Sequence, residues 1–195
     1  MASAPKILVF AGSLRRDSWN KKLARVGADA VRAAGGEATL LDLADLPMPL
    51  YDGDLEKEHG LPEHAKRLKQ LMKDHAGLLI ASPEYNTSIP GVLKNAIDWA
   101  SRAEAGETPL QCFDGKVAAL LSASPGALGG LRGLATLRSI LGGIRVLVIP
   151  EQLAVPKAHE AFDEAGKLKD AKQQTTLAAI AKRLVTVVAR LNAGP

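Results

Sequence analysis

The chain has 195 residues, of which 47% are hydrophobic, 24% are charged and only 4% are aromatic, which is typical of one globular domain with an aliphatic core. Its formal net charge of +4 favours small anionic partners, but the basic residues are mixed with acidic ones and form no stripe expected of a nucleic-acid-binding protein. One cysteine, Cys112, excludes an internal disulfide and a multi-thiolate metal site.

Short apolar segments alternate with longer helical segments along the chain. Strands are expected at Lys6–Ala11, Ala38–Leu41, Gly77–Ala81, Lys116–Leu121 and Arg145–Ile149. Helices are expected at Ser18–Ala34, Pro62–His75, Val92–Ala103, Leu131–Leu141 and Asp170–Leu191. Most of the strands lack polar alternation, as expected when helices cover both faces of a parallel sheet. The pattern predicts an α/β fold, with residues 1–195 forming a single domain around a doubly wound sheet.

The segment Gly12–Asn20 follows the first expected strand, where phosphate-binding loops occur. It lacks Gly-Lys-[Ser/Thr], which holds a triphosphate, and Gly-x-Gly-x-x-Gly, which holds a dinucleotide. Its polar side chains instead suit a terminal monophosphate at the start of a helix, where unpaired N–H groups and the helix dipole attract an anion. The candidate side chains are Ser13, Arg15, Arg16, Ser18 and Asn20, and Asp17, which lies between them, is included as a cofactor-binding residue. Alternatively, Ser18 only caps the helix and its neighbours are solvated.

The segment Ser82–Gly91 follows the third expected strand. Pro83 and Pro90 bracket it and stiffen a loop that is too long for a tight turn. A rigid loop of this kind could present backbone amides to a flat heterocycle that forms hydrogen bonds. An aromatic residue and a carboxamide, Tyr85 and Asn86, stand at its centre. The alternative is a stiff connector whose tyrosine packs locally.

The two segments gain significance from the topology expected for the sheet. In a flavodoxin-like order, 2-1-3-4-5, the first and third strands are neighbours at the switch point, and ligands bind outside their carboxyl ends. One segment suits a phosphate and the other a planar ring, which are the two ends of FMN. A third segment, Ser122–Gly130, consists of small residues that would let its backbone approach the flavin, although an ordinary glycine-rich connection would look the same.

Two stretches of the sequence carry a family resemblance. Gly-Ser-Leu-Arg at 12–15 and Pro-Glu-Tyr-Asn-x-Ser-x-Pro-Gly-x-Leu-Lys-Asn-Ala-Ile-Asp-Trp at 83–99 resemble the NADPH-dependent FMN reductase family, which includes flavin, quinone and chromate reductases and azoreductases. The resemblance extends from the first strand to the last helix. It implies that FMN is the cofactor, with NADPH or NADH as the hydride donor.

The resemblance also implies a role for individual residues. The FMN phosphate would be held by Ser13, Arg15, Ser18 and Asn20. The isoalloxazine ring would be lined, mainly through main-chain groups, by Pro83, Glu84, Tyr85 and Asn86. Ala123 and Ser124 match the third flavin-contacting loop; some relatives carry a hydroxyl at the first of these positions, so contact by Ala123 must use its backbone. The remaining residues of the long motif are expected in helix packing and subunit contact, and are Lys94, Asn95, Asp98 and Trp99.

The expected activity is transfer of hydride from NAD(P)H through FMN to a small acceptor, such as a quinone, an azo compound, chromate or free flavin, by a ping-pong mechanism. No catalytic acid or base is identified; Arg15 and Arg16 are the candidates for the 2′-phosphate of NADPH. The main alternative is a flavodoxin-type electron carrier, which the basic charge disfavours. A regulatory protein without catalysis and a Rossmann dehydrogenase with Asp42 at the end of its second strand are further alternatives.

Partners and location follow from the same observations. A homodimer or homotetramer with a small-molecule acceptor is expected, without nucleic acid, membrane or metal. The four histidines have no metal-ligand spacing and are expected to be surface or structural residues. No apolar run approaches about 20 residues, and the first ten residues do not resemble a signal peptide, so a cytoplasmic protein is expected.

Overall fold

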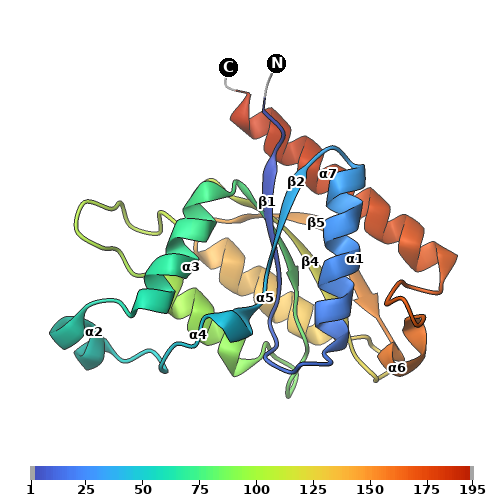
Figure 1. Ribbon diagram of the computed structural model, residues 1–195, viewed down its shortest axis with the longest axis horizontal. Coiled ribbons are helices and arrows are strands. Elements are labelled where there is room, and N and C mark those ends of the chain that lie inside the picture. The colour runs from blue at the N-terminus through green and yellow to red at the C-terminus, as the bar shows by residue number, and fades with distance from the viewer. Residues whose placement is uncertain (1–2, 194–195) are drawn as a thin grey trace.

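A computed structural model describes residues 3–193 and shows a five-stranded parallel sheet between two layers of helices (Figure 1). The strands are β1 (Lys6–Ala11), β2 (Glu37–Leu41), β3 (Gly77–Ala81), β4 (Val117–Ala123) and β5 (Leu147–Val155). The helices are α1 (Trp19–Ala33), α2 (Gly53–His59), α3 (Glu63–Asp74), α4 (Gly91–Ala100), α5 (Leu131–Gly143), α6 (Ala158–Ala161) and α7 (Ala171–Asn192). The strand order is β2-β1-β3-β4-β5, which confirms the expected flavodoxin-like topology.

Burial of both faces of the sheet explains why the central strands are continuously apolar. Along β1, Ile7 and Val9 lie in the core cluster formed with α1 and α7, whereas Leu8 and Phe10 lie in the cluster formed with α3, α4 and α5. Every residue of β3 and β4 is buried. Alternate residues therefore stabilise two separate layers, and the carboxyl ends of β1, β3 and β4 meet at one edge of the sheet.

Two elements, β5 and α4, end three or more residues away from the positions expected from the sequence. The strand expected at Arg145–Ile149 begins later, because Arg145 has a left-handed φ of 70°, and it continues to Val155. Its register against β4 shifts between Ala118 and Leu120, opposite the segment that contains Pro150. Proline has no N–H for the ladder and is tolerated in an edge strand at such an irregularity. The third expected helix ends at Ala100, three residues early, and the short helices α2 and α6 were not predicted.

The segment 46–60, here called the arm, crosses α4 and carries α2 away from the sheet (Figure 1). The indole N–H of Trp99 donates to the carbonyl of Pro49 at 2.8 Å, and Asn95 Nδ2 donates to the same oxygen at 2.9 Å. The backbone N–H of Tyr51 in turn donates to Asn95 Oδ1 at 2.8 Å. These two motif residues therefore anchor the arm on α4, in agreement with their expected role in helix packing.

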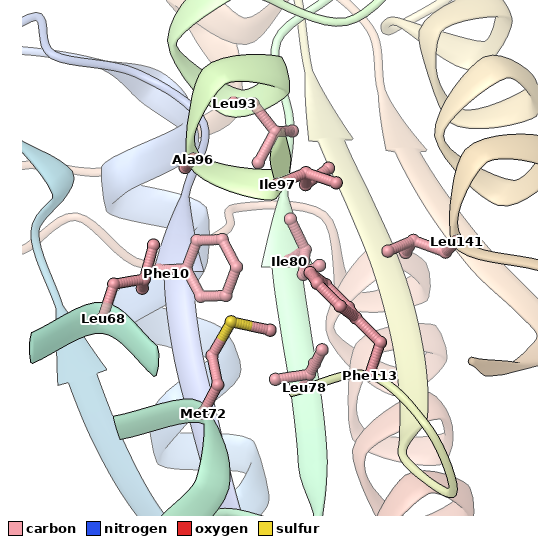
Figure 2. Close-up of a pocket in the computed structure, with 10 residues that line it drawn as sticks. All are labelled: Phe10, Leu68, Met72, Leu78, Ile80, Leu93, Ala96, Ile97, Phe113 and Leu141. Carbon is pink, nitrogen blue, oxygen red and sulfur yellow. The ribbon is translucent and has the colours of Figure 1, made fainter. Parts of the chain in front are cut away.

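A small apolar cavity lies in the core between β1, β3 and the helices α3, α4 and α5 (Figure 2). Its volume is about 10 Å³, which is room for at most about one water molecule. Figure 2 shows that the surrounding side chains point into it, and they are Phe10, Leu68, Met72, Leu78, Ile80, Leu93, Ala96, Ile97, Phe113 and Leu141. A cavity with this lining is a packing gap and has no group that could perform chemistry.

Two further features of the described chain bear on the sequence expectations. Cys112 is buried, and its thiol lies 3.7 Å from the carbonyl oxygen of Lys69, which is consistent with a structural cysteine. Within residues 3–193, no helix combines the length and the apolar character needed to cross a membrane.

Candidate functional site

A shallow cleft of about 60 Å³ lies where the chain leaves β1, β3 and β4. Three loops form it: the first loop, 12–18; the second loop, 82–90; and the third loop, 124–130. The lining residues are Ser13, Arg15, Ser18, Trp19, Asn20, Pro83, Glu84, Tyr85, Ala123, Ser124 and Pro125. The structure thus brings together residues from all three segments that the sequence singled out.

Some candidates do not line the cleft, and two lining residues were not predicted. Arg16, Asp17 and Asn86 are exposed and lie outside the lining. Trp19 and Pro125 line it. Trp19 follows the helix cap directly, and its ring lies 5.8 Å from the guanidinium carbon of Arg15. An aromatic residue beside a polar loop is the sequence signal that could have identified it.

The first loop is rich in unpaired backbone donors. Its start is fixed because Gly12 N–H donates to Ala81 O at 3.0 Å, which extends the ladder between β1 and β3. Ser18 is the N-cap of α1, since its hydroxyl accepts from Asn20 N–H at 3.2 Å. Among residues 3–193, the following N–H groups find no acceptor: Leu14, Arg16, Asp17 and Trp19. Together with the start of a 15-residue helix, they form a loop suited to an anion.

The basic residues of this loop are exposed at its rim. Neither Arg15 nor Arg16 forms an ion pair with any residue in the described part of the chain. Both guanidinium groups are therefore free to meet an anionic ligand, although only Arg15 lines the cleft.

The second loop contains a tight turn at 85–88 that presents Tyr85, although the sequence predicts no tight turn in a loop of this length. Tyr85 and Ser88 exchange two backbone hydrogen bonds of 2.9 and 3.0 Å. Between them, Asn86 and Thr87 have φ angles of 51° and 65°, the pattern of a type I′ turn. A β-branched residue rarely adopts this conformation, so Thr87 holds the turn at some cost in strain. Tyr85 is 49% exposed at the rim of the cleft.

The third loop is held close to the first by Asn20. The carboxamide of Asn20 donates to Ala123 O at 2.8 Å and accepts from Ala123 N–H at 2.9 Å. The loop then turns back through Gly129 and Gly130, which have φ angles of 61° and 90°. The backbone N–H groups of Ala127 and Leu128 have no acceptor within residues 3–193, so this loop also offers donors beside the cleft.

Glu84 has its backbone at the cleft but directs its carboxylate towards α5. The carboxylate accepts from Arg132 N–H at 3.0 Å and from Gly133 N–H at 3.2 Å, and it pairs with the Arg132 side chain. Burial by itself would raise the pKa of Glu84, but these hydrogen bonds outweigh it and hold the pKa below its ordinary value. Any contact between Glu84 and a bound ring would therefore use its main chain, as the sequence led us to expect.

The geometry fits a ligand with an anionic end and a flat end. The unpaired N–H groups of the first loop match a phosphate, and the space between Pro83 and the Ala123–Pro125 segment matches the edge of a planar ring. A family model described as NADPH-dependent FMN reductase matches residues 5–160. The chain belongs to this family.

Individual relatives agree with the assignment. This FMN reductase family member is 37% identical to a 2-hydroxy-1,4-benzoquinone reductase from Burkholderia sp over 163 residues, covering 83% of the chain and 81% of the relative. It is 36% identical to an NAD(P)H-dependent FMN reductase from Pseudomonas aeruginosa, covering 98% and 100%. The solved structure of the flavoenzyme FerB, an NAD(P)H:(acceptor) oxidoreductase from Paracoccus denitrificans, has a TM-score of 0.80 and 30% identity, covering 95% and 98%.

Membership of the family establishes the class of activity. The protein is an oxidoreductase that uses FMN together with NAD(P)H. In this FMN reductase, the three loops lie at the switch point of the sheet, where ligands of open α/β folds bind.

Proposed function

We propose that this FMN reductase passes hydride from NAD(P)H through FMN to a quinone, and that the two substrates use the same site in turn. The family and its quinone reductase relatives support this class of acceptor. Azo compounds, chromate and free flavin are acceptors that the same kind of open site could serve.

The observation that carries the proposal is that a loop rich in unpaired N–H donors lies beside the space between Pro83 and the Ala123–Pro125 segment, here called the slot. The first loop would hold the FMN phosphate through its unpaired N–H groups, the hydroxyls of Ser13 and Ser18, and Arg15. The slot would hold one edge of the ring between Pro83 and Ala123. We also propose the other predicted candidates as cofactor-binding residues, with Arg16 and Asp17 acting from the rim.

The small volume of the cleft supports the successive binding of two substrates. Enclosed pockets for drug-sized ligands have volumes of about 300–1,000 Å³. A cleft of about 60 Å³ can enclose only part of a flavin, so much of the ring would stay open to a second planar molecule. One open face that serves donor and acceptor alternately predicts ping-pong kinetics.

The protein side of the mechanism is orientation and electrostatics. FMN, when bound, supplies the hydride-accepting and hydride-donating chemistry. The first loop positions the cofactor through its phosphate, and Tyr85 at the rim is placed to limit access to the ring. The donors at Ala127 and Leu128 are placed to stabilise negative charge that develops near the third loop. Glu84 has both carboxylate oxygens engaged and is not available as an acid or base.

Subunit contact is a further part of the proposal. Large apolar side chains are exposed on the arm and around the cleft, and they are Leu14, Leu50, Tyr85, Leu128 and Leu131. We propose a homodimer or homotetramer in which these surfaces are covered. Light scattering coupled to gel filtration tests this, and a monomer at micromolar concentration would contradict it.

Steady-state and single-turnover kinetics test the proposed function. With NADPH and a benzoquinone as varied substrates, double-reciprocal plots should be parallel. In the absence of quinone, one equivalent of NADPH should bleach the bound flavin anaerobically, and added quinone should restore the colour. Intersecting plots would contradict alternate use of one site, and a flavin that NADPH does not bleach would contradict hydride transfer from it.

The preference between the two nicotinamide cofactors can be tested with the rim arginines. If Arg16 contacts the 2′-phosphate, Arg16→Ala should lower kcat/KM for NADPH and leave that for NADH unchanged. An unchanged ratio would remove Arg16 from this role, and the same comparison for Arg15→Ala tests the neighbouring side chain.

A further inference from the structure

Glu84 and the first turn of α5 form a closely packed junction behind the cleft. The Glu84 side chain is only 7% exposed, whereas that of Arg132 is 57% exposed. Arg132 Nε donates to one carboxylate oxygen at 2.7 Å, and the backbone N–H groups of Arg132 and Gly133 donate to the other at 3.0 and 3.2 Å. The carboxylate is thus saturated by donors from a single helical turn.

Glycines make this close approach possible. A Cβ atom at Gly133 would lie 3.2 Å from Glu84 Cβ and 3.2 Å from Ser88 O, both on the second loop. A Cβ atom at Gly130 would overlap the hydroxyl of Ser122 and lie 3.6 Å from Glu84 Cβ. Because Gly130 and Gly133 have no side chains, the second loop packs directly on the first turn of α5, which follows the third loop, and Glu84 joins the second loop to that turn.

The charges at this junction are balanced in the folded protein. The lowered pKa of Glu84 keeps its carboxylate ionised at neutral pH. The positive end of α5 and the guanidinium of Arg132 oppose that negative charge. Because Glu84 is one of the residues that line the cleft, an unbalanced charge at the junction would act on a ligand that gains or loses negative charge there.

We propose that Glu84 is a positioning residue whose balanced pairing with Arg132 sets the reduction potential of FMN in the cleft. The inference rests on the proposed function, because it requires that FMN is reduced at this site. Glu84 fixes the second loop on α5, and Arg132 offsets the charge that Glu84 brings. A flavin becomes more negative when it is reduced, so its potential rises when a nearby negative charge is removed and falls when a nearby positive charge is removed.

Two single substitutions give opposite expectations. Glu84→Gln keeps the side-chain shape and one oxygen acceptor but removes the negative charge, so the two-electron potential of bound FMN should rise. Arg132→Gln removes the positive charge and leaves the carboxylate opposed only by the helix, so the potential should fall. The double variant should return towards the wild-type value. Both single variants lose the same ion pair, so loosening of the loops alone would shift both potentials in the same direction.

The measurement is an anaerobic redox titration of the FMN-loaded protein against a reference dye. Arg183→Gln is the matched control, because Arg183 is an exposed arginine on α7 whose guanidinium lies 3.8 Å from the carboxylate of Glu151. The reduction potential of FMN bound to this variant should equal that of the wild type. Shifts in the same direction, or no shift in either variant, would overturn the inference. If Glu84→Gln does not fold, the exposed Arg132→Gln decides alone: a lower potential supports the inference, and an unchanged or higher one overturns it.

The same experiment separates this inference from the proposed function. If the wild-type protein takes up no FMN, the proposed function fails and the inference fails with it. If the wild-type protein holds FMN and is reduced by NADPH but the two variants do not shift in opposite directions, only the inference fails.

Discussion

The side-chain amide of Asn20 pairs with the backbone of Ala123 in both directions, as a neighbouring strand would. It donates to Ala123 O at 2.8 Å and accepts from Ala123 N–H at 2.9 Å, across 103 positions of the sequence. Both residues are buried. This pair fixes the start of α1 against the end of β4, and so it fixes the distance between the first and third loops of the cleft.

Replacing Asn20 by alanine should therefore weaken both stability and cofactor binding. The substitution leaves a buried N–H and a buried C=O without partners, and each such loss costs about 1–3 kcal/mol. We expect the apo protein to lose roughly 2–6 kcal/mol, which at this chain length lowers Tm by about 4–24 °C, and the Kd for FMN to rise. Calorimetry and fluorescence titration measure the two effects. Arg25→Ala, an exposed change on the same helix, should alter Tm little, and an Asn20→Ala protein as stable as this control would refute the role.

The third loop requires glycine at one position and tolerates alanine at another. Gly130 has a φ of 90°, and a Cβ atom there would overlap Ser122 Oγ, so Gly130→Ala should destabilise the protein by at least about 1–3 kcal/mol. At Gly126 the nearest atom to an added Cβ is Ser124 Oγ at 3.7 Å, so Gly126→Ala should change stability by no more than about 0.5 kcal/mol. Urea unfolding of the two variants measures the difference, and equal midpoints would show that the loop is not so constrained.

The sheet and its loops could be predicted from the sequence because their signals are local. Apolar runs mark buried parallel strands, and the polar or glycine-rich segments that follow three of them mark the edge where a ligand binds. Helix ends were predicted within one to three residues. The strand order could be predicted because alternating strands and helices indicate a doubly wound, flavodoxin-like sheet, and no single residue indicates it.

The features that could not be predicted depend on contacts between distant segments. The arm is shaped by hydrogen bonds from Asn95 and Trp99, some 46 and 50 positions further along the chain. The carboxylate of Glu84 was assigned to the flavin region, but its direction depends on N–H groups of α5, 48 and 49 positions away. Asn20 is predicted to hold the FMN phosphate, but its pairing with Ala123, 103 positions away, has no signal in the local sequence.

Substitutions at two adjacent residues of the motif at 83–99 should differ sharply in their effect on the free energy of unfolding. Trp99 is fully buried and donates its indole N–H to Pro49 O, so Trp99→Phe should lower the free energy of unfolding by at least about 1 kcal/mol. Asp98 forms a solvent-exposed pair with Lys94, so Asp98→Asn should change it by about 0.5 kcal/mol or less. Chemical denaturation of both variants tests the contrast, which fails if the two losses are the same.

Acid stability should depend on the carboxylate of Glu107. Burial alone would raise its pKa, but the Glu104 N–H and the ammonium groups of Lys69 and Lys73 outweigh burial and lower the pKa to about 2. A carboxyl group with a lowered folded-state pKa stabilises the protein above its unfolded pKa, and this contribution is lost as pH falls towards the folded value. Tm should therefore fall between about pH 4.5 and pH 2.

The Glu107→Gln variant isolates that contribution. It should be less stable than the wild type at pH 7, and the difference in Tm between the two proteins should shrink as pH falls through the same interval. A difference that stays constant from pH 7 to pH 2 would show that Glu107 does not supply the pH-dependent stability.

A crystal structure of the protein with FMN tests the central claim most directly. The account predicts density for the phosphate within hydrogen-bond distance of the backbone N–H groups of the first loop, and density for the ring beside Pro83 and Ala123. FMN bound elsewhere on the molecule, or a cleft that stays empty at saturating FMN, would contradict it.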